Sequence, residues 1–343
     1  MKISNELNPV KATQIRKDKM RAIVQTEYGS TDVLRLKEVD KPIVPDNGVL
    51  VRVHATAVNA GDWHLMRGTP FLIRLIFGGL LKPKITILGS DIAGRVEAIG
   101  KDVTQFQPGD EVFGDISECG FGAFAEYVCV IETALVLKPT NKTFEEAATI
   151  PWAALAALQG LRDFGQIQSG QKVLINGASG GVGSFAVQIA KSYGAEVTAL
   201  CSPKKMDMVR SLGADQVIDY TQTDITQTGQ QYDLIFDAAA YRSVFDYLPV
   251  LTTEGTYVLV GGSTPRLFLV MFLGSLISKI LRQKVKFLIT KPNQADLVII
   301  RDLIMAGKIS PYISQHYTLR EIPAAIRQLE QRQVMGKIAI SID

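Results

Sequence analysis

The stretch KVLINGASGGVGSFAVQIAKSYGAEVTALC, residues 172–201, decides the fold of this chain. A strand-like run leads into the glycine-rich segment NGASGGVG (176–183), and a helical pattern (182–193) and a second apolar run, EVTALC, follow. Glycines let the backbone turn tightly and approach a pyrophosphate, and the next helix N-terminus offers free N–H groups and a positive dipole end. Compared with GxGxxG, alanine replaces the first glycine in the order Ala178, Ser179, Gly180, Gly181, Val182 and Gly183. Strand, glycines, helix and next strand in this order predict a dinucleotide-binding site, with a ligand-free turn as the alternative.

Outside this stretch, the pattern of strand-like and helix-like segments changes twice along the chain. Short strand-like runs separated by Gly, Pro and Asp extend from Met20 to about Pro139, and strands then alternate with helices. This alternation predicts an α/β fold with a doubly wound parallel sheet, the Rossmann fold. Near the end the pattern returns to two helices and a last strand. We therefore predict a flexible tail at 1–19, a β-rich catalytic domain at 20–149 and 292–343, and an inserted Rossmann NADP-binding domain at 150–291.

The end of the second strand of the motif indicates which nucleotide binds. NAD sites typically have an acidic residue there, which accepts hydrogen bonds from the adenosine ribose. This chain has Cys201, followed by Ser202, Pro203, Lys204 and Lys205. No carboxylate repels a 2′-phosphate, and a hydroxyl and two ammonium groups are available to bind it. We therefore predict NADPH rather than NADH, with solvated lysines at a helix start as the alternative.

The composition narrows the class of protein. The 343 residues have a formal net charge of +3 with dispersed basic side chains, which argues against a nucleic-acid binder. Three cysteines without a CxxC pair argue against a disulfide framework and a structural zinc site. Because free cysteines fit a reducing compartment and the first residues contain no apolar signal-peptide core, we expect a cytoplasmic protein.

Two apolar stretches, 71–81 and 267–281, need an interpretation of their own. The second has about fifteen residues before Arg282, fewer than the roughly 20 that a membrane-spanning helix needs. We therefore expect no integral membrane segment. Both stretches are interpreted as buried helices or a wall of the substrate pocket, and peripheral membrane contact stays open.

Several motifs in a fixed order point to a family. They are VNAGDWHLMRG (58–68), LGSDIAGRVEAIG (88–100), QPGDEVFG (107–114), GAFAEYV (122–128), AATIPWAALAAL (147–158), NGASGGVG (176–183), SLGADQVIDY (211–220) and GKIAI (336–340). From Met20 onwards the chain resembles the medium-chain dehydrogenase/reductase superfamily, and within it the zinc-independent quinone oxidoreductases and enone reductases. The resemblance implies a GroES-like catalytic domain and a homodimer that pairs through TYVLVGG (256–262) as an edge strand.

The resemblance also shows which metal ligands are missing. Zinc-dependent members hold a catalytic metal with Cys, His and Cys, and have a Glu beside the His. Here Asn59 stands at the first position, Ser90 and Asp91 replace the His-Glu pair, and no cysteine lies near Pro151. Amide and hydroxyl groups are poor Zn²⁺ ligands, so we predict no metal. Without a Lewis acid, a conjugated acceptor is easier to reduce than a simple aldehyde, because its developing charge is delocalised.

Matching positions of the family give the candidate cofactor residues. Ser202, Lys205 and Tyr220 match contacts to the 2′-phosphate, and Arg332 resembles an arginine that reaches the same group. Lys337 is the alternative basic partner, because the spacing of this turn varies among subgroups. The ends of two strands should face the nicotinamide; their residues are Asp237, Ala238, Val260, Gly261 and Gly262. A solvated Lys205, a packing Tyr220 and a helix-capping Asp237 are the alternatives.

The loop without the zinc ligand holds the catalytic candidates. Asn59 is predicted to bond the nicotinamide ribose or the acceptor oxygen, with loop stabilisation as the alternative, and Asp62 is the second candidate, with a structural role preferred. Trp63, Phe71 and Phe77 are predicted pocket residues for a small hydrophobic carbonyl or quinone substrate, with ordinary core packing as the alternative. The sequence thus predicts an NADPH-dependent quinone oxidoreductase or enone reductase. Reduction of lipid-derived alkenals and a weakly catalytic NADPH-binding sensor stay open.

Overall fold

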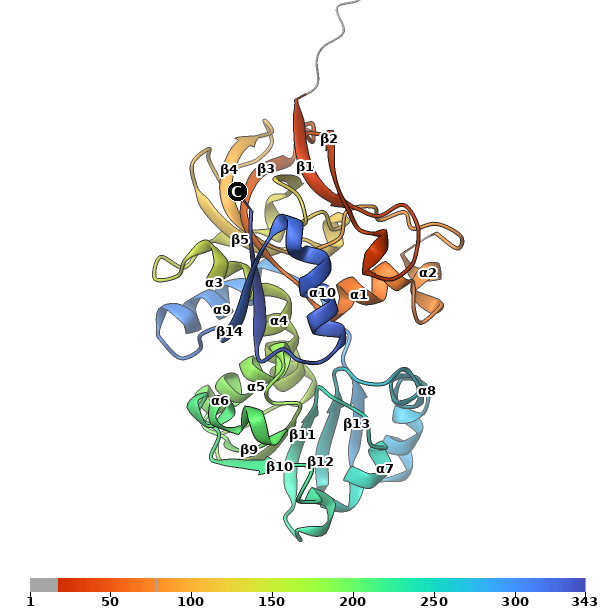
Figure 1. The fold of residues 1–343 in the computed structure, drawn as a ribbon. Coiled ribbons are helices and arrows are strands. Elements are labelled where there is room, and N and C mark those ends of the chain that lie inside the picture. The colour runs from red at the N-terminus through yellow and green to blue at the C-terminus, as the bar shows by residue number, and fades with distance from the viewer. Residues whose placement is uncertain (1–17, 78, 343) are drawn as a thin grey trace, which may run out of the picture.

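The computed structural model describes residues 18–77 and 79–342. Residues 1–17 of the predicted tail lie outside the described residues, and the first strand already begins at Lys19. Two large sheets organise the chain: a parallel sheet occupies the lower half of Figure 1, and a mostly antiparallel sheet occupies the upper half. The α/β architecture expected from the sequence is therefore present.

The lower sheet has the strand order of a doubly wound fold. All its strand pairs are parallel. In spatial order the strands are β10 (Gln216–Asp219), β9 (Glu196–Cys201), β8 (Lys172–Asn176), β11 (Tyr232–Asp237), β12 (Leu251–Leu259) and β13 (Lys284–Phe287). The chain starts in the middle, at β8, and winds outward in both directions, so the switch in direction falls between β8 and β11, where such sheets bind ligands.

The position of β12 corrects one expectation. TYVLVGG was expected to form the edge of the sheet, but β12 lies between β11 and β13. The edge strand is β13, whose sequence KVKF was not recognised as a strand. It is short and places two lysines beside an apolar segment, so its sequence pattern is weak.

The upper sheet joins segments from both ends of the chain. β15 pairs antiparallel with β3, so the last strand completes a sheet that the first half of the chain begins. Its strands are β14 (Ile313–Thr318), β15 (Lys337–Ser341), β3 (Gly48–Ala57), β4 (Asp91–Ile99), β5 (Glu111–Asp115) and β7 (Val136–Leu137), with β6 (Tyr127–Ile131) paired to β3. β1 (Lys19–Val24) and β2 (Arg35–Asp40) form a separate two-stranded sheet. The exact domain boundaries stay predictions.

Helices fill the connections, and proline and glycine set several of their ends. Pro151 begins a helix because its missing N–H is not needed in the first turn. The helices are α1 (Ala60–Arg67), α2 (Leu72–Ile76), α3 (Phe144–Ala148), α4 (Pro151–Gln159), α5 (Gly181–Ser192), α6 (Met206–Ser211), α7 (Val244–Tyr247), α8 (Thr264–Ile280), α9 (Gln294–Met305) and α10 (Ile322–Glu330). The predicted helix at 182–193 is thus present with its start one residue earlier.

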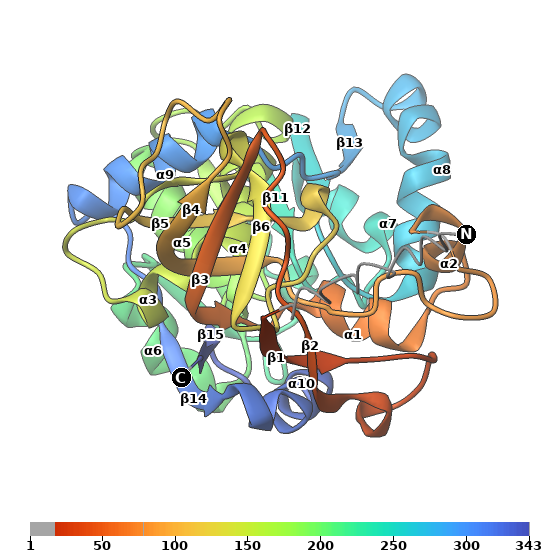
Figure 2. The same cartoon turned by 90° about the horizontal axis from the view of Figure 1, so that it is seen from above.

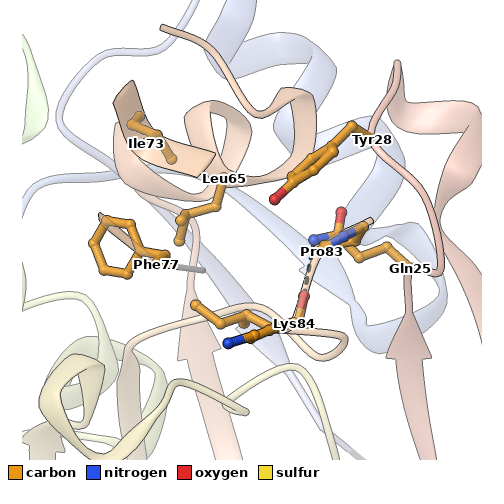
Figure 3. A pocket seen from close by; sticks show the side chains of 8 residues that line it. Gln25, Tyr28, Leu65, Ile73, Phe77, Pro83 and Lys84 are labelled. Carbon is orange, nitrogen blue, oxygen red and sulfur yellow. Dashed lines mark hydrogen bonds between the residues drawn. The ribbon is translucent and has the colours of Figure 1, made fainter. Parts of the chain in front are cut away.

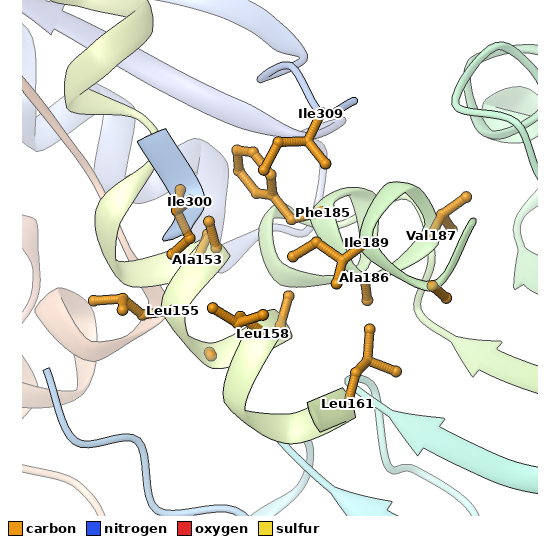
Figure 4. Packing of buried hydrophobic residues seen from close by; sticks show 14 of the residues in the cluster. Ala153, Leu155, Leu158, Leu161, Phe185, Ala186, Val187, Ile189, Ile300 and Ile309 are labelled. Atoms are coloured by element: carbon orange, nitrogen blue, oxygen red, sulfur yellow. The ribbon is translucent and has the colours of Figure 1, made fainter. Parts of the chain in front are cut away.

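A continuous apolar core fixes α4 and α5 beside the parallel sheet. Ala153 and Leu158 of α4 and Phe185 and Ile189 of α5 belong to one buried cluster, which Ile300 of α9 joins (Figure 4). α4 is buried along almost its whole length. This packing holds the N-terminus of α5, and hence the glycine-rich loop, in a fixed place relative to the rest of the molecule.

The two apolar stretches are less buried than expected. In α8 only Val270, Gly274 and Ile277 are buried, and no residue of α2 is buried. The prediction of buried helices is therefore wrong for most of these side chains. The reason is topological: α8 packs on β13 at the edge of the sheet, where nothing in the described chain covers its outer side. No helix in the described residues is long and apolar enough to cross a membrane.

Candidate functional site

The glycine-rich loop leaves backbone N–H groups free at the start of α5. Gly177 has a φ of 77°, a left-handed conformation that glycine adopts without strain. Gly180 precedes α5 and no side chain caps the helix. In the described part of the chain, the N–H groups of Gly181, Val182 and Gly183 have no hydrogen-bond partner. Such free donors at a positive dipole end fit a pyrophosphate.

Close packing explains why this loop needs glycine. A Cβ on Gly183 would lie 2.1 Å from the carbonyl oxygen of Gly177, whereas one on Gly180 would have no atom nearer than 3.4 Å. Gly183 therefore lets α5 pack on the turn, and Gly180 leaves room in front of the helix. Ala178 and Ser179 are buried within the turn. The residues of the loop thus fit the phosphate groups of NADPH.

The residues predicted at the 2′-phosphate come together beyond the end of β9. The N–H of Tyr220 donates to the carbonyl of Cys201 over 3.4 Å, next to Ser202. Lys205 Nζ donates to the carbonyls of Val334 (2.7 Å) and Arg332 (3.2 Å). Burial lowers the pKa of Lys205, its main perturbation. Lys205 is therefore an anchored side chain rather than a solvated one.

Arg332 reaches this region from the other half of the molecule. Its backbone is left-handed, with a φ of 58°, and its guanidinium lies 4.3 Å from the ring centre of Tyr241. The exposed guanidinium is available to a phosphate. Lys337, the alternative basic partner, has other contacts: its Nζ donates to Asn59 in the catalytic half. Lys205 contacts the backbone carbonyl of Arg332, and which of the two basic side chains binds the 2′-phosphate stays a prediction.

Asp237 connects the strand ends through buried hydrogen bonds. Its carboxylate is fully buried and accepts hydrogen bonds from Tyr257 Oη (2.6 Å) and Asn176 Nδ2 (2.7 Å). Burial raises the pKa of Asp237 to about 6, against the effect of these two donors. It does not cap α7, whose N-cap is Ser243. The side chain thus holds β8, β11 and β12 in register, and it is not exposed to a ligand.

The other strand-end residues contribute backbone rather than side chains. The N–H groups of Val260 and Gly261 donate to the carbonyl of Asp237, and Ala238 donates to Asn176. Gly262 has a φ of 150° and its Cα lies so near Ala240 that a Cβ would meet backbone at 2.5 Å. These contacts set the two strand ends side by side, as a nicotinamide-facing edge requires.

Asn59 is the centre of a buried polar cluster. Its side-chain oxygen accepts from Lys337 Nζ (2.5 Å), and its Nδ2 donates to Asp91 Oδ2 (2.9 Å) and to Ser90 Oγ (3.4 Å). The side chains of Lys337 and Asp91 are 3% and 0% exposed. Their charged atoms are 3.4 Å apart, so each charge is compensated where water is excluded.

Asp91 links this cluster to α4. Its Oδ1 accepts the N–H of Trp152 over 2.8 Å, and its backbone carbonyl accepts from Thr56 Oγ1 over 2.6 Å. Burial raises the pKa of Asp91, and the charge of Lys337 and the amide of Asn59 oppose this rise. By resemblance alone, Asp91 stands only where zinc-dependent members have the Glu beside a metal-binding His. Its role was missed, together with those of Asn176 and Tyr257, because only folding brings their partners close.

Asp62 has a structural position in the start of α1. Its carboxylate accepts the N–H groups of Asn59 (2.7 Å) and Gly89 (3.2 Å), and the first of these bonds belongs to a capping box. Burial raises the pKa of Asp62 to about 7, despite these hydrogen bonds. The preferred structural interpretation of Asp62 agrees with this geometry.

The three predicted pocket residues have different surroundings. Phe77 lines a shallow hollow between α1, α2 and the segment 83–85, and Figure 3 shows it next to Leu65. Trp63 stacks on His64 with ring centres 3.6 Å apart, and Phe71 is 57% exposed. All residues that line the hollow belong to the catalytic half. The hollow is therefore separate from the glycine-rich loop.

The two halves of the site meet at the last turn before β15. Gly336 N–H donates to the carbonyl of Ser179 in the glycine-rich loop over 2.8 Å. A Cβ on Gly181 would lie 3.1 Å from Lys337 Cδ. Lys337 therefore touches the start of α5 with its carbon chain and Asn59 with its ammonium group. Cofactor loop and polar cluster are in direct contact.

Comparison with known proteins places this architecture in a family. The model of the alcohol dehydrogenase GroES-like domain matches residues 45–140, and that of the zinc-binding dehydrogenase matches residues 212–340. The 2-methylene-furan-3-one reductase of Solanum lycopersicum is 33% identical over 333 residues, which cover 94% of this chain and 79% of the relative. This chain belongs to the medium-chain dehydrogenase/reductase superfamily. The predicted membership and the GroES-like domain are confirmed.

Other members of the superfamily agree in class. The chloroplastic NADPH-dependent alkenal/one oxidoreductase of Arabidopsis thaliana is 33% identical over 334 residues, covering 94% of this chain and 79% of the relative. The solved structure of the quinone oxidoreductase from Coxiella burnetii has a TM-score of 0.83 at 28% identity and covers 95% of this chain and 100% of that one. The prediction of an NADPH-dependent oxidoreductase from the quinone oxidoreductase and enone reductase group is confirmed.

Proposed function

We propose that this chain is a zinc-independent reductase that transfers hydride from NADPH to a quinone or an α,β-unsaturated carbonyl compound. The observation that carries the proposal is the Lys337 ammonium, which is buried between Asn59 and Asp91. By resemblance, Asn59 and Asp91 stand where zinc-dependent members have a metal ligand and its neighbouring Glu. A fixed ammonium at this point disfavours a second cation by charge repulsion.

The donor set supports the same proposal. Asn59 and Ser90 offer an amide and a hydroxyl, which bind Zn²⁺ poorly. In the described residues, no three His, Cys, Asp or Glu side chains are grouped to hold a metal ion. The cation held at this position is the Lys337 ammonium, and the Asp91 carboxylate compensates its charge.

The chemistry then divides between cofactor and protein. NADPH, when bound, supplies the hydride from C4 of its nicotinamide ring. The free N–H groups at the start of α5 hold the pyrophosphate, and Lys205 and Arg332 hold the 2′-phosphate. The buried charge of Lys337 favours the negative oxygen that develops as a conjugated acceptor is reduced. Asn59 and Asp91 keep that ammonium in place, and water supplies the proton.

Turnover with an acceptor panel tests the proposal. NADPH oxidation is followed with 1,4-benzoquinone, 9,10-phenanthrenequinone and a 2-alkenal, with and without a chelator. We expect turnover that the chelator does not change, and a loss of kcat of at least tenfold in Lys337→Met. Activity lost with the chelator contradicts the metal-free site. Tight NADPH binding without any turnover favours the sensor, and a preference for the 2-alkenal favours the second candidate, an activity named for the Arabidopsis relative.

The two neighbouring lysines test the cofactor preference. Lys205 is anchored beside Arg332, whereas Lys204 is exposed and contacts no acidic partner in the described residues. Lys205→Met should weaken NADPH binding about tenfold and leave NADH binding unchanged, because only NADPH carries the 2′-phosphate. Lys204→Met is the matched control and should change neither. Equal effects of both substitutions, measured by fluorescence titration, would contradict the assignment of Lys205.

Oligomeric state and location stay predictions. The expected homodimer relied on β12 as an edge strand, and β13 covers that edge. A cytoplasmic location is expected from the free cysteines, while matched relatives from Arabidopsis thaliana and Danio rerio are described as chloroplastic and mitochondrial. Sedimentation velocity of the purified chain measures the first directly.

A further inference from the structure

α8 is apolar on all sides, but the protein covers only one of its faces. Ser278 Oγ accepts the N–H of Val285 over 2.8 Å and so ties the inner face to β13. On the outer face Phe272, Leu276 and Ile280 follow each other at intervals of four, and they are 70%, 54% and 73% exposed. A helix that is hydrophobic all round is normally buried, so the outer face of α8 is expected to have a partner.

A second exposed apolar segment lies on the same side of the molecule. Figures 1 and 2 both place α2, from the upper half, on the same side of the molecule as α8, from the lower half. In the described part of the chain, 13 of the 22 exposed large apolar side chains belong to residues 71–81 and 271–281. We call these two segments the α2–α8 surface. Its apolar groups come from both halves, so the surface is a property of the folded molecule.

The charge around this surface has a single sign. Residues 63–90 and 255–295 contain no Asp or Glu, although the whole chain has 34 acidic residues. The same two segments contain ten Lys and Arg residues. Lys82, Lys279, Arg282 and Lys284 are exposed and form no ion pair within the described residues. The two segments that carry the apolar side chains therefore contribute basic groups and no carboxylate that would repel an anionic partner.

We propose that the α2–α8 surface binds the surface of a lipid bilayer that contains anionic lipids. Apolar side chains that enter the acyl boundary and basic side chains that meet the headgroups are the two parts of interfacial binding. A second copy of the chain fits less well, because a two-fold contact would bring the same basic groups against each other. The proposal does not depend on which acceptor the enzyme reduces.

Vesicle sedimentation with the full chain tests this proposal. The chain is mixed with vesicles of phosphatidylcholine alone or with phosphatidylglycerol added, and the bound fraction is measured. We expect binding to the anionic vesicles that weakens with salt, and little binding to neutral ones. Phe272→Glu/Ile280→Glu should weaken binding at least tenfold. Ile43→Glu/Ile299→Glu, which adds the same two charges at exposed residues elsewhere, should bind as the wild type does.

A second double variant tests the proposal without introducing charges into the apolar face of α8. Lys279→Gln/Arg282→Gln removes two exposed charges and should weaken binding to anionic vesicles roughly thirtyfold, at about 1 kcal/mol for each charge. NADPH affinity and melting temperature, measured for every variant, identify folded protein. No binding of the wild type to anionic vesicles, or equal binding of all variants, overturns the proposal. A dimer that forms without vesicles and is broken by Phe272→Glu/Ile280→Glu, with no vesicle binding, overturns it in favour of self-association.

Discussion

Asp115, at the end of β5, shows how a single buried group sets a dependence on pH. Its Oδ1 accepts the N–H of Ser117 over 2.9 Å, and its Oδ2 has no hydrogen-bond partner among the residues that the structure describes. Burial, and then the nearby charge of Asp91, raise the pKa of Asp115 to about 7. The folded state therefore favours the protonated carboxyl, whereas an unfolded chain ionises it near pH 4.

The sign of the resulting effect follows from linkage. The stability that the protonated Asp115 contributes is complete below about pH 4 and is lost as the pH rises towards 7. Asp115→Asn cannot ionise, so its free energy of unfolding should gain about 2 kcal/mol relative to wild type between pH 5 and pH 8. Urea unfolding at both pH values measures this difference, with Asp102→Asn, at an exposed residue, as control. A wild-type-to-variant difference that is the same at both pH values would contradict it.

At the scale of elements, the turn between β8 and α5 is the most constrained junction in the site. Gly183 is surrounded by backbone atoms of Gly177 and Ala178, which cannot move like a flexible side chain. The same turn leaves the N–H groups at the start of α5 free, where we propose that the pyrophosphate binds. The packing of α5 and the proposed binding of the cofactor thus depend on the same turn.

Gly183→Ala should disturb both properties. A Cβ at this position overlaps the carbonyl oxygen of Gly177, so we expect a loss of about 2 kcal/mol in the free energy of unfolding and weaker NADPH binding. Gly261→Ala is the matched control for stability, because its Cβ would have no contact nearer than 3.4 Å. Chemical denaturation compares the two. If Gly183→Ala is as stable as Gly261→Ala, the close approach of Gly183 to Gly177 does not limit the stability of the protein.

At the scale of the whole molecule, the two sheets are joined through the site itself. Lys205 bonds the carbonyl of Val334, and Gly336 bonds that of Ser179, so the segment before β15 lies against the parallel sheet. In the proposed site, NADPH bound at this junction would contact residues from both halves. Its binding energy should therefore stabilise the molecule as one unit.

Calorimetry with NADPH tests this coupling. At a hundred times its Kd, NADPH should add about 2.7 kcal/mol to the free energy of unfolding and raise Tm in a single transition. NADH at the same concentration should raise Tm less, because it lacks the 2′-phosphate for which we propose Lys205 and Arg332 as partners. Two transitions, of which only one moves with NADPH, would show that the halves unfold separately.

The sequence by itself determined the features that depend on local patterns. The order of strand, glycines and helix at 172–201 predicted the Rossmann sheet and its phosphate loop, because glycine conformations and helix termini act over a few residues. Cys201 with its following Ser and Lys residues predicted NADPH. The motifs along the chain were sufficient for the family.

The tertiary structure alone decided what depends on distant residues. Lys337 and Asn59 are 278 positions apart, and no local pattern indicates that their side chains meet. Likewise, the sequence of β12 predicts a strand but not its place in the sheet. Only the pairing with β13 shows that β12 is not the edge strand. The apolar sequence of α8 predicted burial, whereas its place beside the last strand of the sheet leaves one face open. Residue type sets what a segment prefers to bury, and the topology sets which partners are within reach.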